Sequence, residues 1–150
     1  MSFIIDGHNL IPCIQGMSLD QMDDELLLID ILESYFRSLR KRAVIFFDGG
    51  KPGEKLTIKR AFVTARFIHQ PLNADQAIRN QLMLLGGSAK NYTVVSSDNE
   101  IVTYVKRLGA HSLSSQEFAK RVKSFRNNTP HQSSPDNDVD FWLEQFNKIS

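Results

Sequence analysis

The sequence has very little cysteine and no long hydrophobic run among its 150 residues. Cys13 is the only cysteine, so an internal disulfide is excluded and no cysteine pair with zinc-ligand spacing exists. The most apolar stretch, residues 26–36, is interrupted by Asp30 and Glu33, which argues against a membrane-spanning helix. These absences predict a globular protein of a reducing compartment with no membrane partner.

Signals for export are also missing. Only Phe3, Ile4 and Ile5 precede Asp6, without a basic segment or a small-residue cleavage site, so we expect a cytoplasmic location. The net charge of +1 neither favours nor excludes nucleic acid as a partner.

Five short runs rich in β-branched and aromatic residues alternate with helical stretches, which is typical of a parallel sheet covered on both faces. The expected strands are residues 3–6, 43–48, 65–70, 92–97 and 110–113. The expected helix starts are the pairs Ser18 with Gln21, Asn73 with Gln76, Ser97 with Glu100, and Ser114 with Glu117. Glycines at 86, 87 and 109 are expected to end two of these helices.

The composition changes near the C-terminal end of the chain. We expect one domain over residues 1–126, a flexible linker rich in Asn, Ser and Pro over residues 127–137, and a short helical segment over residues 138–150. An apolar stripe in that segment is expected to pack back on the domain or to bind a partner.

Aspartates follow the expected strands at the edge where parallel α/β sheets bind ligands. Asp6 and Asp48 end the first and second strands, Asp98 follows the fourth, and Asp75 lies in the first turn of a helix. Taken singly, Asp6 and Asp48 fit Asp-Gly turns, and Asp75 and Asp98 fit helix N-termini. Because the strand ends converge, all four are predicted to share one cleft.

Clustered carboxylates oppose one another's ionisation unless a cation neutralises them. Oxygen ligands favour Mg²⁺ or Mn²⁺ over zinc, and such ions activate water and stabilise charge on a phosphate. The pattern therefore predicts phosphodiester hydrolysis, with Asp6, Asp75 and Asp98 as metal ligands and Asp48 completing or supporting the site.

Other side chains have both a structural and a functional interpretation. Asn9, three residues after Asp6, is expected to orient a water or a phosphate, although a loop asparagine also forms turns. Ser96 and Ser97 could contact phosphate, but Ser97 is assigned to the helix cap. The bases after Asp48 either bind an RNA backbone or lie in a solvated loop; they are Lys51, Lys55, Lys59, Arg60 and Arg66.

Four segments, in order, resemble the motifs of NYN-domain nucleases of the PIN-like fold. They are residues 4–11 (IIDGHNLI), 46–49 (FFDG), 74–78 (ADQAI) and 94–98 (VVSSD), and the branch they resemble is the YacP-like group. The resemblance covers roughly residues 2–125. It departs at Asn73, where relatives carry Thr or an acid, and over residues 49–64, which have no clear match.

The resemblance implies a PIN-like, Rossmannoid three-layer sandwich with a mainly parallel five-stranded sheet. It also implies a divalent-metal-dependent endoribonuclease with catalytic residues Asp6, Asn9, Asp48, Asp75 and Asp98. Ribosome-associated messenger RNA is the substrate it suggests, in the cytoplasm or a plastid stroma.

Rival functions are a catalytically weak RNA-binding or ribosome-docking module and a small-molecule phosphatase. His8 stands two residues after Asp6, so the Asp-x-Asp pair of such phosphatases is missing. No phosphate-loop motif of the GxxxxGK[ST] type occurs either.

Overall fold

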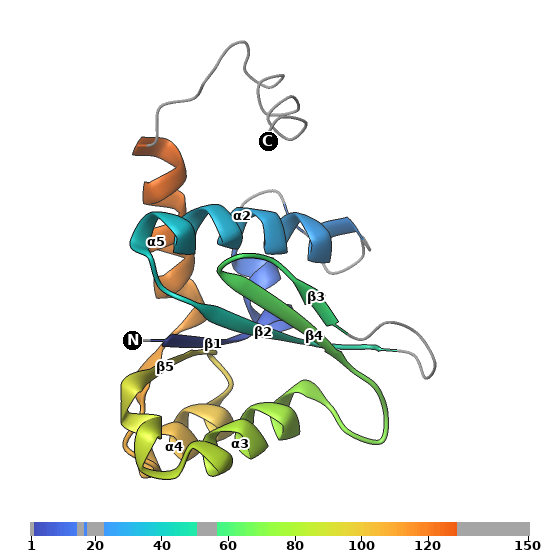
Figure 1. The fold of residues 1–150 in the computed structure, drawn as a ribbon, viewed down its shortest axis with the longest axis vertical. Helices are drawn as coiled ribbons and strands as arrows, with labels where there is room; N and C mark the ends of the chain where they lie inside the picture. The colour runs from blue at the N-terminus through green and yellow to red at the C-terminus, as the bar shows by residue number, and fades with distance from the viewer. Residues whose placement is uncertain (1, 15–16, 18–22, 51–56, 129–150) are drawn as a thin grey trace.

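The computed structural model describes residues 2–14, 17, 23–50 and 57–128, and within them the chain forms one six-stranded sheet (Figure 1). The strand order is β3-β4-β2-β1-β5-β6. All neighbouring strands are parallel except the pair β3 and β4. The strands are β1 Ser2–Asp6, β2 Ala43–Asp48, β3 Thr57–Lys59, β4 Val63–Ile68, β5 Tyr92–Val95 and β6 His111–Leu113.

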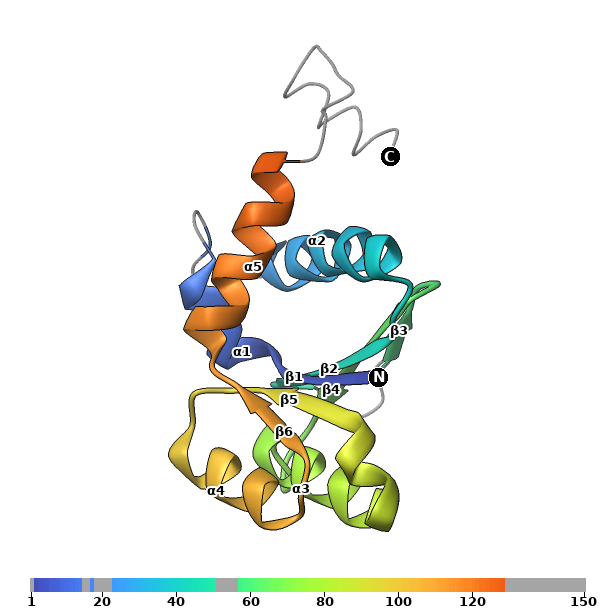
Figure 2. The same ribbon diagram turned by 90° about the vertical axis from the view of Figure 1, so that its left-hand side faces the viewer.

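Helices cover both faces of this sheet. Figure 2 shows α2 and α5 on one face and α3 and α4 on the other. The helices are α1 Gly7–Leu10, α2 Asp23–Leu39, α3 Ala74–Leu85, α4 Asn99–Arg107 and α5 Ser115–Asn128, with short 3-10 helices η1 Ile11–Cys13 and η2 Gly86–Asn91. The expected three-layer α/β architecture is confirmed.

The central strands are buried on both faces, as their unbroken apolar sequences predict. Ile5, Ile45 and Phe47 pack against the α2 and α5 layer, whereas Ile4 and Phe46 pack against the α3 and α4 layer. Alternation of side chains along each strand therefore divides the core into two clusters, one per face. This double burial fixes the strands, and with them the edge at which the aspartates lie.

The expected number of strands was too low by one. The three residues of β3, Thr57–Lys59, form an antiparallel edge strand against β4 and lacked a strand signal of their own. β4 also begins and ends two residues earlier than expected, at Val63 and Ile68, and β5 ends at Val95 rather than at residue 97. The carboxyl end of β5 therefore leaves Ser96 and Ser97 in the loop that follows.

Most helix boundaries follow the expected capping residues. Asn73 Oδ1 accepts a hydrogen bond from Gln76 N at 2.8 Å, and Ser114 Oγ accepts one from Glu117 N at 3.0 Å. The prediction for α4 was wrong by one residue, because Asp98, not Ser97, is its N-cap. With β5 ending at Val95, Asp98 is the residue from which the helix begins.

The C-terminal predictions fall largely outside the described residues. Helix α5 continues to Asn128, so the first two residues of the expected linker are helical. The rest of that linker and the segment 138–150 lie beyond the part that the structure describes, as does the expected cap at Ser18 and Gln21. Within the described residues, no helix is long and apolar enough to span a membrane.

Candidate active site

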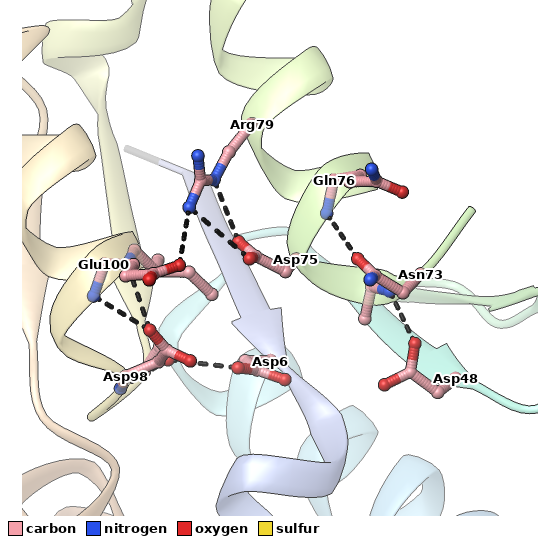
Figure 3. Close-up of polar contacts among 11 residues, drawn as sticks. Asp6, Asp48, Asn73, Asp75, Gln76, Arg79, Asp98 and Glu100 are labelled. Atoms are coloured by element: carbon pink, nitrogen blue, oxygen red, sulfur yellow. Dashed lines mark hydrogen bonds and ion pairs between the residues drawn. The ribbon is translucent and has the colours of Figure 1, made fainter. Parts of the chain in front are cut away.

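The four predicted aspartates come to one edge of the sheet. Asp6 ends β1, and Asp48 ends the neighbouring strand β2. In the parallel register Asp6 pairs with Phe46, so Asp48 lies two residues further along its strand. Asp98 begins α4 after β5, the strand on the other side of β1, and Asp75 lies in the first turn of α3. Figure 3 shows these residues around the end of β1.

Asp6 is the most perturbed of these acids. The pKa of its carboxyl is raised from 3.8 to about 6, mainly by burial, with smaller contributions from the negative charges of Asp48, Asp98 and Asp75. A hydrogen bond from Ser96 Oγ to Asp6 Oδ2, at 3.0 Å, opposes that shift. The other three acids therefore lie close enough to Asp6 for their charges to act on its carboxyl.

Asp48 and Asp98 each use one oxygen to hold a helix start. Asp48 Oδ1 accepts from the backbone N–H of Ala74, the first residue of α3, at 2.6 Å. Asp98 Oδ1 accepts from the N–H groups of Glu100 and Ile101 at 2.8 and 3.3 Å. Asp98 thus lies at a helix N-terminus, as its structural interpretation expected, but as the N-cap that had been assigned to Ser97. The second oxygen of Asp98 makes no hydrogen bond with the described residues.

Asp75 is held by a residue that the sequence analysis did not single out. Arg79, one turn later on α3, binds Asp75 at 3.0 Å and also binds Glu100 of α4 at 3.2 Å (Figure 3). The guanidinium also lies 5.6 Å from the centre of the Tyr104 ring, a cation–π arrangement. The spacing of four between an acid and a base on a helix was the available signal for the first pair.

Asn9 lies in the helical turn α1, directly after β1, rather than in a loop. Its side-chain Oδ1 accepts hydrogen bonds from Ser97 N at 2.8 Å and from Ser115 Oγ at 2.6 Å. Ser115 is fully buried at the start of α5. Asn9 therefore connects α1, the loop after β5 and α5, and its carbonyl oxygen is engaged in this structural contact.

The glycine after Asp6 has a packing role that the sequence analysis did not identify. A Cβ added at Gly7 would lie 2.4 Å from the Phe47 ring, so a side chain there would push α1 off β2. His8 follows and binds Glu25 of α2 through Nε2. Its ring is thereby directed to the helix layer. By contrast, Gly49 after Asp48 has a φ of +93°, as a turn requires.

The carboxylate oxygens match the donor type that Mg²⁺ and Mn²⁺ prefer. In residues 2–14, 17, 23–50 and 57–128, however, no three His, Cys, Asp or Glu side chains are grouped so as to hold a metal ion directly. Both oxygens of Asp75 are already engaged by Arg79. By donor chemistry the acids suit a hard divalent ion, and Asp6, Asp48 and Asp98 make no ion pair with a described base.

The predicted RNA-binding bases do not form a single described surface. Lys59 and Arg66 face Thr64 and Thr57 across the β3–β4 pair, which places both bases on the sheet face covered by α3. Arg60 instead lies 3.5 Å from Asp30 of α2, in the opposite layer. Lys51 and Lys55 lie outside the described residues.

Known proteins share this fold. Crystal structures of Rae1 (YacP) from Bacillus subtilis are similar to the chain: one matches with a TM-score of 0.70 and 20% identity over 85% of this chain and 76% of that chain. The W164L mutant matches with a TM-score of 0.70 and 19% identity, covering 84% and 77% of the two chains. No curated protein sequence matches significantly. The model of the YacP-like NYN domain matches residues 3–144, and the chain therefore belongs to that family.

Proposed function

We propose that the chain is a divalent-metal-dependent endoribonuclease that hydrolyses RNA phosphodiester bonds. The observation that carries the proposal is the meeting of Asp6, Asp48, Asp75 and Asp98 at the carboxyl edge of the sheet, close enough to raise the pKa of Asp6. Structural ion-pair networks also gather acids, but here only Asp75 of the four makes an ion pair with a described base, Arg79, whose other partner is Glu100.

In this proposal Asp6 and Asp98 bind the ion, and Asp75 and Asp48 complete or support the site. A bound Mg²⁺ or Mn²⁺ supplies activation of water and neutralisation of charge on the phosphate. Ser96 orients Asp6 through its hydroxyl, while the N–H groups at the start of α4 fix Asp98. The chain thus holds its two principal acids in place through its own hydrogen bonds.

The proposed partners are RNA and, following the family resemblance, ribosome-associated messenger RNA in the cytoplasm. A second candidate function is a catalytically weak RNA-binding module. The observation that favours it is the engagement of both Asp75 oxygens by Arg79. Cleavage measurements separate the two, because only the nuclease requires a metal ion.

The test is cleavage of end-labelled single-stranded RNA by the purified chain with chelator, Mg²⁺ or Mn²⁺. Asp6→Asn and Asp98→Asn should each reduce metal-dependent cleavage by at least about 100-fold, the scale of losing a major charge-stabilising group. Asparagine is as good an N-cap as aspartate, so Asp98→Asn should leave α4 intact.

Asp30→Asn on α2 is the matched control, since Asp30 pairs with Arg60 away from the cluster, and it should retain activity. Full cleavage in chelator, or full activity in both cluster variants, would refute the proposed nuclease site.

A further inference from the structure

A hollow of about 430 Å³ lies beside Asp48 at the same edge of the sheet. Its lining comes from the end of β2, the end of β4 and the connection from β4 to α3. Pockets that hold small organic groups have volumes of roughly 300–1,000 Å³, so the hollow is large enough for a ring system.

Glycines form the part of the lining that follows Asp48. Gly49 has a φ of +93°, which disfavours a side chain there, although no atom lies within 4 Å of its Cβ position. A Cβ at Gly50 would lie 2.6 Å from the carbonyl oxygen of Phe67. Gly50 N also donates to Ile68 O at 3.1 Å, which binds the segment to the end of β4. Both positions therefore leave backbone, without side chains, along this wall.

Apolar side chains provide another part of the lining. Ile68 is half-buried at the end of β4, and Leu72 is 48% exposed in the connection to α3. One half-exposed leucine is ordinary on a protein surface, but Leu72 shares the lining of the hollow with Ile68. Ile68 and Leu72 together form an apolar surface against which a flat, apolar group can pack.

Hydrogen-bonding groups complete the lining. Asn73 uses Oδ1 to cap α3, which leaves its side-chain NH₂ as a donor. The exposed Gln70 amide supplies a donor and an acceptor, and its side chain makes no hydrogen bond with the described residues. Asp48 has one oxygen held by Ala74 N and a second that remains an acceptor. The hollow thus combines apolar surface with donors and acceptors.

We propose that this hollow binds one nucleobase of an RNA strand whose phosphate lies at the four aspartates; this inference rests on the proposed nuclease function. Asp48 connects the two sites, because it lines the hollow and also contributes to the charge that raises the pKa of Asp6. Unstacked bases of single-stranded RNA present apolar faces and hydrogen-bonding edges, the chemistry that this lining complements. The bound base fixes the position of the RNA strand, and hydrogen bonds from Gln70 and Asn73 determine which base is preferred.

The test measures RNA affinity in the Asp6→Asn background, so that binding is read without cleavage. In a series of short single-stranded RNAs, each RNA carries one abasic nucleotide, and its position moves by one from each RNA to the next. Fluorescence anisotropy gives the dissociation constant of each RNA. We expect one position at which removal of the base weakens binding by at least about 5-fold, the lower end of what one stacked base contributes.

Two variants of the hollow complete the design. Leu72→Ala should weaken binding to intact RNA several-fold but should have no effect on the RNA that is abasic at the sensitive position. Gln70→Ala should change the preference among bases at that position. The matched control is Leu84→Ala, because Leu84 is also exposed, at 85%, but lies at the end of α3 and does not line the hollow.

The inference fails if no abasic position weakens binding, or if Leu72→Ala weakens binding to intact and abasic RNA equally. Metal-dependent cleavage by the wild-type chain in that case would leave the proposed function standing. Absence of both RNA binding and cleavage would overturn the two proposals together.

Discussion

Arg79 binds Asp75 through both oxygens of the carboxylate, with Nε–Oδ1 and Nη2–Oδ2 distances of 3.0 and 3.4 Å. The same guanidinium reaches Glu100 on α4, so the base joins two helices at the acidic edge. The hydrogen bond to Asp75, and then the negative charge of that residue, raise the pKa of Arg79, which stays protonated at any physiological pH. Arg79 is thus a resident cation beside the proposed metal ligands, and a divalent ion that uses Asp75 must compete with it.

The first prediction follows from this competition. Arg79→Ala should increase the affinity of the chain for Mn²⁺ by about 2- to 5-fold, the scale of an exposed ion pair, as measured by titration calorimetry. Arg107→Ala on the exposed last turn of α4 is the control for loss of one positive charge. In an Asp75→Asn background the effect of Arg79→Ala should disappear. Weaker Mn²⁺ binding by Arg79→Ala would show instead that Arg79 organises the site for the ion.

The second prediction concerns pH and the stability of the metal-free chain. The pKa of Asp6 is raised from 3.8 to about 6, so between these values the folded state holds a proton that the unfolded state has released. The contribution of Asp6 to the free energy of unfolding is therefore largest below pH 4 and decreases as the pH rises towards 6. Above the folded pKa it no longer changes with pH.

Asp6→Asn removes this pH-dependent decrease in the free energy of unfolding, because the amide carries no charge. Its free energy of unfolding relative to wild type should rise between pH 4 and 7 by up to about 3 kcal/mol, the equivalent of the pKa difference. Urea unfolding in chelator across this pH range measures it. Parallel pH profiles for the two proteins would mean that Asp6 is not perturbed by burial and its acidic neighbours.

The third prediction separates two roles for Asn9. Loss of its Oδ1 in Asn9→Ala leaves the buried Ser115 hydroxyl and the Ser97 N–H without their acceptor, which should lower the free energy of unfolding by roughly 1–3 kcal/mol. Asn9→Asp keeps an acceptor oxygen and should be less destabilised. If Asn9→Ala retains full stability but loses activity, its role is to orient a water or phosphate, as the sequence analysis expected.

The fourth prediction concerns the bases on the β3–β4 pair. Lys59→Ala and Arg66→Ala should each flatten the dependence of RNA affinity on salt, by roughly 0.7 in logarithmic slope per lost single-strand phosphate contact. Arg60→Ala is the internal comparison, because Arg60 lies towards Asp30 in the other layer and should change the slope less. Binding measured over a series of KCl concentrations tests this. Equal slopes for all variants would assign these bases to the solvated surface.

Much of the architecture was predictable because its causes are local. Unbroken apolar runs such as that of β2 specify strands buried on both faces, and cap residues such as Asn73 specify helix starts through contacts a few positions away. The edge strand β3 was missed because three residues with one apolar side chain, Ile58, carry no period of their own. Pairing with β4, and not local propensity, makes that segment a strand.

The sequence by itself determined that Asp6 and Asp48 end strands and that Asp98 follows one, and the carboxyl ends of parallel strands share one edge of a sheet. The position of β1 between β2 and β5 was decided by the tertiary structure. Only the tertiary structure decided what surrounds these aspartates. Asn9 meets Ser115 across 106 positions, and Arg79 meets Glu100 across 21. Neither separation corresponds to a repeat of a helix or strand, so these contacts arise only when packed layers bring the segments together. The hollow beside Asp48 likewise depends on how the ends of β2 and β4 meet the start of α3, which no single segment encodes.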